Sequence, residues 1–380
     1  MTDRDAGRTA LALLSALALA ALALAACATP PAGGGASGRA SPASADRRNA
    51  GPDARLDARL APVASIPRPA RHDALARALD SLLERAAPAV GGVSVLVVRG
   101  DTVLYDRSLG AIGARDAIPV ASAAKWMGGA LLASLADDGL LSFDDSLGRF
   151  LDAGSPIARG IRIGRLFSHT SGLPRTATCL ADRRARLDPC AREIVEGGLV
   201  RRPGERFAYG GASMQVAARI AELAGGGSWN ALFDARIATP LGLEATTFPG
   251  AMPHVAGGLV SSRDDYARLL RMLLDSGAFA GRRVLSPAAI EAMERDWTRG
   301  TVPEPPVPVH TVGYGIGMWI QRADSAGRAV ELSSQGAFGF TPWIDRERNL
   351  LGVVAMRYEG GGEGFETAAR VRRLVRDAVK

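Results

Sequence analysis

The sequence predicts an α+β fold, in which one antiparallel sheet is built from strands near both ends of the folded region and a mainly helical region is inserted between them. Strand-like runs of β-branched and aromatic residues occur over 93–107 and again over 313–357. The stretch between them, about 121–300, has helical periodicity that Gly and Pro interrupt. Because strands and helices do not alternate one by one, a parallel sheet of βαβ units is disfavoured. A cleft between the sheet region and the helical region is the expected place for a site.

Local patterns justify each element in turn. Leucines with the spacing of one helical face predict a helix over 72–87. The next two runs, 93–99 and 102–107, are joined through a Gly-Asp pair and predict a hairpin. Short runs rich in Val, Ile, Trp and Tyr predict an antiparallel meander at 313–321, 329–334, 338–345 and 350–357. A closing helix is expected over 363–379. Helices are expected to flank the sheet.

The N-terminal part of the chain has the layout of a lipoprotein leader. Arg4 and Arg8 precede an uncharged run of Ala, Leu, Thr and Ser at 9–26, which ends in small residues directly before Cys27. That layout predicts a signal peptide over 1–26, cleaved on export, and a lipid on the thiol of Cys27. The alternative is a plain membrane span, for which a run of about 18 mostly Ala residues is marginal.

The predicted leader also indicates where the protein is located. Residues 27–71 are mostly Ala, Gly, Pro, Ser and Arg, with almost no large apolar residue to bury, which predicts a flexible tether before a domain over 72–380. We therefore expect an exported lipoprotein of the bacterial cell envelope, held at the periplasmic face of a membrane through Cys27.

Composition and charge limit the function classes. With 380 residues and 47% hydrophobic content, the chain can bury a sizeable core. The net charge is +7, but the basic residues are scattered and form no stripe interleaved with aromatic residues, so we expect no nucleic-acid partner. Two of the 46 basic residues are lysines, Lys125 and Lys380. Because a desolvated amine can release its proton and a guanidinium cannot, the lone internal lysine indicates proton transfer.

Two further cysteines, Cys179 and Cys190, lie in one polar segment. An exported protein reaches an oxidising compartment, where they could pair. Closing a loop this short stabilises a fold by roughly 2–3 kcal/mol in the chain-entropy model. Since no CxxC or Cys/His spacing suggests a metal, the sequence predicts a structural disulfide, no metal site and no cofactor.

Ser122 and Lys125 stand three residues apart at the start of a predicted helix, directly after an extended segment. This spacing puts the hydroxyl and the amine on one helix face, and the first-turn amides point toward an anion that forms at the serine. Such an S-x-x-K pair is an activated nucleophile, although a helix cap beside a surface lysine is the alternative. The following residues, Trp126 and Met127, can desolvate the amine, which favours the catalytic interpretation.

Further motifs follow this pair in a fixed order: IRIGRLFSHTSGLP at 161–174 and PGERFAYGGASMQVAARIAE at 203–222. Together with Ser122-x-x-Lys125 they resemble the serine β-lactamase-related family, which groups class C β-lactamases, penicillin-binding proteins and esterases. The resemblance covers about 72–380. It implies a β-lactamase/transpeptidase-like fold and hydrolysis through an acyl-enzyme.

The resemblance also implies roles for individual residues. Ser122 would be acylated, Lys125 would take or relay its proton, and Tyr209, in the Tyr-x-Asn slot of the family, would act as a second base and protonate the leaving group. A tyrosine beside a lysine shares a proton network in which each proton weakens the other's binding. The backbone amides of Ser122 and Ala337 would form the oxyanion hole, in which each donor contributes a few kcal/mol.

Two positions depart from the family pattern. The Asn of the Tyr-x-Asn slot is Gly211 here, and the Lys-Thr-Gly or His-x-Gly strand is best matched by Ser334-Gln335-Gly336. By position, Gly211, Gln335 and Gly336 would contact substrate. The missing cation is the group that meets the carboxylate of a β-lactam or peptide in the family, so esters or amides without that carboxylate are expected.

Other catalytic motifs are disfavoured. His169 could suggest a Ser-His-Asp triad, but it lies in a turn motif, Thr-Ser-Gly-Leu-Pro, that suits a structural histidine. No serine lies in a G-x-S-x-G elbow, and the sequence contains no HExxH zinc motif. A metal-independent mechanism is therefore expected.

Two function classes are compatible with these residues. The first is a monomeric serine hydrolase for a small ester or amide or a peptidoglycan-derived substrate, with carboxylesterase-like activity ahead of β-lactamase, D-Ala-D-Ala carboxypeptidase and D-aminopeptidase. The second is a non-catalytic envelope module that binds peptidoglycan or another protein, suggested by the polar groups lost at Gly211 and at 334–336. A binding module has no need of a lone lysine three residues after a serine, so the enzyme is favoured.

Overall fold

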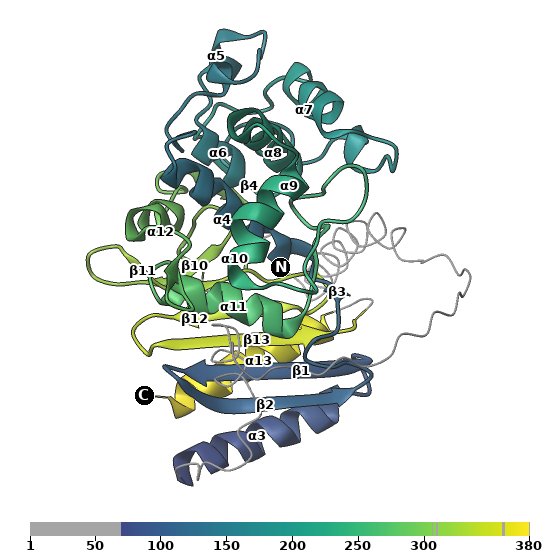
Figure 1. Ribbon diagram of the computed structural model, residues 1–380, viewed down its shortest axis with the longest axis vertical. Coiled ribbons are helices and arrows are strands. Elements are labelled where there is room, and N and C mark those ends of the chain that lie inside the picture. Colours follow the sequence, from purple (N-terminus) through teal and green to yellow (C-terminus); the bar gives the residue numbers. More distant parts are fainter. Residues whose placement is uncertain (1–69, 306, 309–310, 359–361, 380) are drawn as a thin grey trace, which may run out of the picture. The chain divides into compact units, whose positions relative to one another are not determined.

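The computed structural model describes residues 70–305, 307–308, 311–358 and 362–379 (Figure 1). These belong to one compact unit of the chain, Pro62–Lys380. The predicted leader over 1–26, the lipidation site Cys27 and the predicted tether up to residue 69 lie outside the described residues. The first described helix, α3, begins at Ala70.

One antiparallel sheet of seven strands organises this unit, in the order β2-β1-β13-β12-β11-β10-β9. The N-terminal hairpin joins the C-terminal meander where β1 pairs with β13, with Val95 opposite Val354. The prediction that the sheet comes from both ends of the folded region is therefore confirmed. The strands are β1 (Gly92–Arg99), β2 (Thr102–Gly110), β9 (Gly313–Tyr314), β10 (Trp319–Ala323), β11 (Ala329–Ser333), β12 (Thr341–Asp345) and β13 (Leu350–Met356).

Two predicted strands have different bounds in the structure. The run 313–321 is split into β9 and β10 by a turn in which Gly317 has a φ of +92°. A Cβ on Gly317 would lie 2.1 Å from the carbonyl oxygen of Lys125, so the turn lets the two segments approach closely. The run 338–345 starts as a strand only at Thr341, because the amide of Gly339 donates to the carbonyl of Gly336 and closes a turn there.

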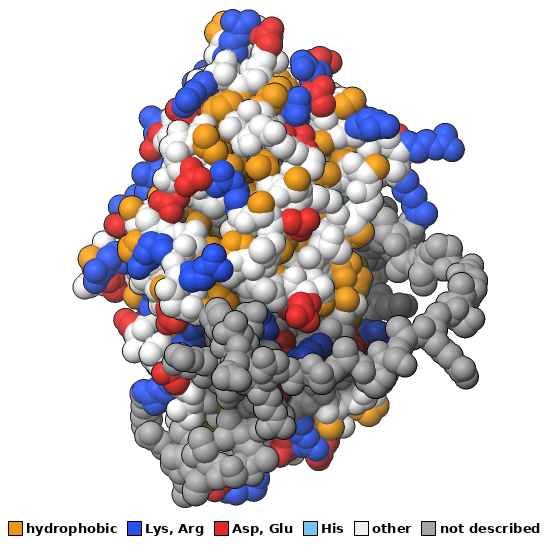
Figure 2. All heavy atoms as spheres, in the orientation of Figure 1, with side chains coloured by type: hydrophobic (Ala, Val, Ile, Leu, Met, Phe, Trp, Pro, Cys, Tyr) orange, Lys and Arg blue, Asp and Glu red, His pale blue; other side chains and the backbone are white. Residues whose placement is uncertain are grey.

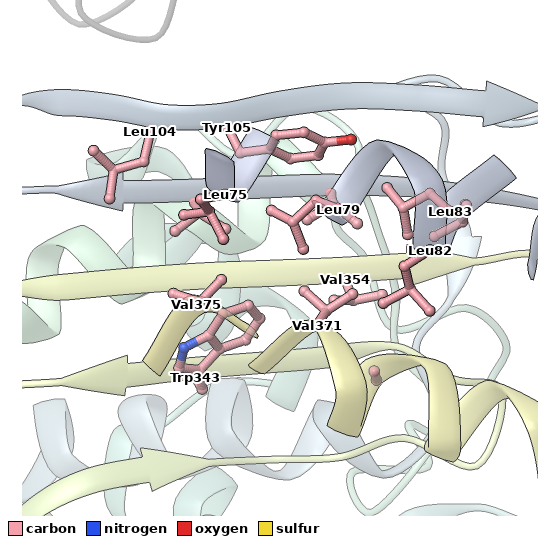
Figure 3. Packing of buried hydrophobic residues seen from close by; sticks show 14 of the residues in the cluster. Leu75, Leu79, Leu82, Leu83, Leu104, Tyr105, Trp343, Val354, Val371 and Val375 are labelled. Carbon is pink, nitrogen blue, oxygen red and sulfur yellow. The ribbon is translucent and has the colours of Figure 1, made fainter. Parts of the chain in front are cut away.

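One face of the sheet is covered by the first and last described helices, α3 (Ala70–Ala86) and α13 (Glu363–Ala378), which contact each other (Figures 1 and 3). Leucines of α3 and valines of α13 pack on strand side chains, and Figure 3 shows Leu79, Val371 and Trp343 among them. All three are buried. Burial of such side chains contributes about 1.5–3 kcal/mol each.

The other face of the sheet carries α11 (Arg263–Leu274), which packs on β13 and β12. Its first residue, Arg263, is buried and tied to the sheet by polar contacts. The guanidinium donates to the carbonyl of Val95 and, at 2.6 Å, to the carboxylate of Asp106. These contacts attach the start of α11 to β1 and β2.

The remaining helices form the region inserted between the two halves of the sheet, as predicted (Figure 1). At its centre is α4, in which every residue from Ala124 to Leu135 is buried. A helix that is apolar on all sides belongs in a core, and here it carries the Ser-Lys motif at its start. The α-helices are α4 (Ala124–Asp137), α5 (Pro156–Arg159), α6 (Ile163–Phe167), α7 (Leu187–Glu196), α8 (Ala212–Gly225), α9 (Trp229–Phe233), α10 (Thr239–Leu241) and α12 (Pro287–Glu294).

Shorter elements connect this region. Single turns of other helix types occur at η2 (Ala121–Ala123), η3 (Leu147–Arg149), η4 (Thr178–Leu180) and η5 (Asp234–Ala238). Paired short strands are β3 (Ile118–Pro119) with β5 (Val260–Ser261), β4 (Arg206–Ala208) with β8 (Val302–Glu304), and β6 (Ala278–Phe279) with β7 (Arg282–Arg283).

The described surface mixes both signs of charge. On the face shown in Figure 2, Lys and Arg side chains are interspersed with Asp and Glu side chains. Within residues 70–379, as far as they are described, every helix falls short of the length and apolarity that crossing a membrane requires.

Candidate active site

The predicted nucleophile, Ser122, lies where an extended segment turns into α4. The preceding residue, Ala121, has a φ of +47°, an uncommon conformation for a residue other than Gly that costs of order 1–3 kcal/mol. Ser122 then falls in η2, one short turn before α4 begins at Ala124. The hydroxyl of Tyr266 in α11 donates to the carbonyl of Ala123 at 2.6 Å, and this hydrogen bond links the turn before α4 to α11.

Lys125 is brought to Ser122 as the spacing predicts. Its side chain is 3% exposed, and Nζ lies 3.0 Å from the Oγ of Ser122. The same Nζ donates to the carbonyl of Ala256 at 2.5 Å. The carbonyl fixes the direction of the amine, so Nζ faces the serine oxygen rather than solvent. The alternative of a surface lysine beside a helix cap is therefore wrong.

Tyr209 lies on the other side of the amine. It follows β4 directly, and Nζ of Lys125 lies 4.7 Å from the centroid of its ring. The ring is stacked on Trp319 of β10, with centroids 5.2 Å apart and planes 16° apart. The structure thus brings Ser122, Lys125 and Tyr209 together, with the amine close to both the serine hydroxyl and the tyrosine ring.

The imidazole ring of His169 packs against the ring of Tyr209. Its φ is +61°, its side chain is 3% exposed, and its ring centroid lies 4.5 Å from that of Tyr209. Burial, and then the positive charges of Lys125 and Arg175, hold the pKa of His169 well below its usual value, so the imidazole is neutral. The histidine therefore belongs to a buried turn, as predicted.

The end of β11 forms the wall opposite the tyrosine. The hydroxyl of Ser334 donates to the carbonyl oxygens of Ser122 and Gly317, both at 3.3 Å. A Cβ on Gly336 would lie 2.1 Å from the carbonyl of Val120, so only glycine fits there. Ala337, whose amide is a predicted oxyanion donor, comes next in the chain, and it is partly exposed like Gln335. The matched segment therefore contacts the backbone of Ser122 through the Ser334 hydroxyl.

The slot that holds Asn in the family is apolar here. Gly211 is the N-cap of α8, and its amide donates to the carbonyl of Arg175 at 2.9 Å. A Cβ on Gly211 would meet the Cβ of Ala256 at 3.3 Å and the Cδ1 of Leu180 at 3.7 Å. The two atoms within 4 Å of such a Cβ are therefore both carbons.

The predicted disulfide is present. Cys179 in η4 and Cys190 in α7 are bonded, with Cα atoms 5.4 Å apart, and both side chains are buried. The bond fixes the segment that presents Leu180 next to Gly211. Within the described part of the chain, no group of three or more His, Cys, Asp or Glu side chains is placed to hold a metal ion.

Several contacts at the site were not predicted from the sequence. The carbonyl of Ala256 orients Lys125, Trp319 stacks on Tyr209, and Arg175 donates to the carbonyl of Tyr209. A backbone carbonyl leaves no residue pattern, and Trp319 looks like an ordinary strand residue. Arg175 directly follows the motif at 161–174. That position was the one feature of the sequence that could have indicated a place at the site.

A partly exposed serine paired with a buried lysine at the start of a central helix, beside an antiparallel sheet, defines a site of the serine-hydrolase class. A model of the Beta-lactamase family matches residues 79–377. The chain therefore belongs to the Beta-lactamase family of serine hydrolases and has its β-lactamase/transpeptidase-like fold.

Individual relatives agree with this assignment. The chain is 31% identical over 281 residues to penicillin-binding protein 4 of Amycolatopsis lactamdurans, covering 63% of this chain and 71% of that protein. It is 24% identical to a D-alanyl-D-alanine-carboxypeptidase/endopeptidase of Escherichia coli, covering 58% of this chain and 65% of that protein. The crystal structure of a Bacteroides dorei protein, assigned provisionally to the β-lactamases, superimposes with a TM-score of 0.70 at 31% identity, over 78% of this chain and 98% of that one.

Proposed function

We propose that this protein hydrolyses a small ester or amide through an acyl-enzyme on Ser122, with Lys125 and Tyr209 as general base and acid. The observation that carries the proposal is the 3.0 Å contact between a buried Lys125 Nζ and the Ser122 Oγ. An amine held this way, in its uncharged form, accepts the hydroxyl proton as Oγ attacks a carbonyl carbon.

The remaining steps are assigned to groups around that pair. The Oγ–C bond forms and a tetrahedral oxyanion develops, which the backbone amides of Ser122 and Ala337 are proposed to stabilise. Tyr209 then protonates the leaving alcohol or amine as its bond to carbon breaks, leaving the acyl group on Ser122. Water completes the cycle by the same proton transfers in reverse order.

The substrate class follows from the substituted positions. The segment Ser334-Gln335-Gly336 offers no cation to a substrate carboxylate, and Gly211 offers no side-chain amide. Both features support an ester or amide without a carboxylate next to the scissile bond, and hence a carboxylesterase-like subtype. Burying a substrate carboxylate without a partner would cost binding energy.

A second candidate is D-Ala-D-Ala carboxypeptidase or β-lactamase activity, because penicillin-binding protein 4 and the Escherichia coli carboxypeptidase are relatives. A panel of p-nitrophenyl esters, nitrocefin and D-Ala-D-Ala peptides separates the candidates. The proposal expects ester turnover that is lost in Ser122→Ala. Turnover of nitrocefin or peptides alone would favour the second candidate, and binding to cell-wall sacculi without any turnover would favour a non-catalytic module.

We further propose that the protein acts as a monomer at the periplasmic face of the cell envelope, anchored through a lipid on Cys27. The charged start, the apolar run and the small residues before Cys27 support this proposal. Metabolic labelling with a palmitate analogue tests it. Label should enter the full chain and be absent from Cys27→Ala, and equal labelling of both would contradict the proposal.

A further inference from the structure

Tyr209 is held by hydrogen bonds on both sides of its own position in the chain. The amide of the residue before it, Ala208, donates to the carbonyl of His169 at 2.9 Å. The amide of the residue after it, Gly210, donates to the imidazole Nδ1 of His169 at 3.3 Å. One buried residue therefore brackets the tyrosine and also packs its ring against it.

Arg175 completes this arrangement from the exposed side. Its Nε donates to the carbonyl of Tyr209 at 2.9 Å, and its own carbonyl accepts from the amide of Gly211. A Cβ on Gly210 would lie 2.2 Å from the Arg175 carbonyl, so the two backbones are in close contact. The peptide groups around Tyr209 are thus bonded to His169 and Arg175.

The segment around Tyr209 is packed on one side and borders open space on another. A cavity of about 270 Å³ lies behind it, bordered by His169, Arg175, Ala208 and Gly210. Open space on that side would let the segment move if the hydrogen bonds were removed. In a well-packed interior the neighbouring side chains would prevent such movement.

His169 lowers the stability of the turn that contains it, which is unexpected if its role is structural alone. Because Nδ1 accepts a hydrogen bond in the neutral ring, the proton lies on Nε2, which is buried without a partner among the described residues. An unpartnered buried donor costs about 1–3 kcal/mol, and the positive φ adds to that cost. Charged and titratable groups around the ring are Lys125, Arg175, Tyr209 and Tyr314.

We propose that His169 and Arg175 are positioning residues, which hold the backbone of Tyr209 so that its side chain meets the proton-transfer pair. The inference rests on the proposed function. It assigns a role to two residues that form no hydrogen bond with the proposed nucleophile, Ser122, or the proposed base, Lys125. Displacing a catalytic group by about 1 Å can lower a rate by as much as 10²-fold.

A matched pair of variants tests His169. Asn can place an oxygen near the position of Nδ1 and tolerates a positive φ, whereas Leu has a similar shape and no acceptor. We expect His169→Leu to lower kcat for p-nitrophenyl acetate about 10- to 100-fold with little change in KM, and His169→Asn to retain most of the activity. The pH dependence of kcat should shift in the Leu variant and return in the Asn variant.

A second pair keeps the test valid if His169→Leu fails to fold. Arg175 is exposed, and its Nε can be replaced by the Nε2 of Gln or removed in Met, which has a similar length. We expect Arg175→Gln to stay close to wild type and Arg175→Met to lose several-fold in kcat. Arg201→Met is the control, because Arg201 borders the same cavity but pairs with Glu304 at 3.1 Å.

Combining each His169 or Arg175 variant with Tyr209→Phe shows whether the residue acts on the reaction through the Tyr209 hydroxyl or independently of it. A residue that acts only through the Tyr209 hydroxyl has no further effect on kcat once that hydroxyl is absent. Equal losses in His169→Leu and His169→Asn, or full additivity with Tyr209→Phe, would overturn the positioning role. If wild type neither turns over esters nor reacts with a fluorophosphonate at Ser122, the proposed function itself fails, which is a separate result.

Discussion

The two clusters that flank the sheet differ in chemistry. The cluster under α3 and α13 is built mainly from Leu and Val side chains, with Tyr105 and Trp343 among them (Figure 3). The cluster beside the Ser-Lys pair combines Phe207, Tyr314 and Trp319 with Tyr209, His169 and the amine of Lys125. The first cluster gains free energy mainly from apolar burial, and the Tyr105 hydroxyl at its edge donates to Asp80. The second contains a positive φ angle at His169 and an imidazole nitrogen without a hydrogen-bond partner among the described residues, both typical of a site whose geometry is maintained for function.

This difference predicts that mutations separate activity from stability. The largest effect is expected for Tyr209→Phe, which removes only the hydroxyl. Ester turnover should fall by about 10²- to 10⁴-fold, because a general acid is lost. The free energy of unfolding should change little, since the ring keeps its contacts with Trp319 and Lys125. Steady-state kinetics and urea unfolding of the same sample measure both, and unchanged turnover would remove Tyr209 from the mechanism.

The opposite pattern is expected in the aliphatic cluster. Leu79 is fully buried, and Leu79→Ala should lower the free energy of unfolding by about 2–5 kcal/mol. Turnover per folded molecule should stay at the wild-type value. Leu223 in α8 is 41% exposed, and Leu223→Ala is the control, with a change within about 0.5 kcal/mol. A large loss of turnover in folded Leu79→Ala would show that the two clusters are coupled.

The disulfide should have a smaller effect. Its cysteines are 11 positions apart, so breaking the bond frees a short loop. Replacing Cys179 and Cys190 together with Ala should lower the free energy of unfolding by about 2–3 kcal/mol. Urea unfolding of the variant and of wild type under reducing conditions should give similar midpoints. A variant as stable as oxidised wild type would contradict a stabilising role.

The smallest effect is a pH dependence of stability. The pKa of His169 is lowered in the folded state, so below about pH 6.5 the unfolded state binds a proton that the folded state does not. Stability is therefore complete above that pH and falls as pH decreases, by at most about 1.4 kcal/mol per pH unit for one histidine. Burial also lowers the pKa of His254, which acts in the same direction. Unfolding at pH 7.5, 6.5 and 5.5 should give a shallower dependence in His169→Asn, and an identical dependence would refute the assignment.

The sequence predicted the parts of this architecture that local patterns determine. Runs of β-branched and aromatic residues located the strands, and the Ser-x-x-Lys spacing located a serine and a lysine that the fold brings within 3.0 Å of each other. The split of 313–321 was missed because it depends on the carbonyl of Lys125, which only the folded chain brings to Gly317. The stacking of Trp319 on Tyr209 likewise joins segments that are far apart in sequence.

The backbone contacts of the site could not be predicted for a different reason. A carbonyl such as that of Ala256 exists at every residue, so no residue type marks it as the partner of Lys125. His169 was assigned to a turn, which is correct, but its contact with Tyr209 depends on where β4 lies beside it. Sequence patterns therefore identified the candidate reactive groups, and the structure showed which groups contact them.

The central claim is that Lys125 activates Ser122, and covalent labelling tests it most directly. The measurement is the rate at which a fluorophosphonate adds to the protein, with the modified residue located by mass spectrometry, in wild type and in Lys125→Arg. Arg keeps the positive charge and cannot accept the serine proton. The account predicts labelling at Ser122 in wild type and a rate lower by about 10²-fold or more in the variant. Equal rates in the two proteins, or labelling at another residue, would contradict it.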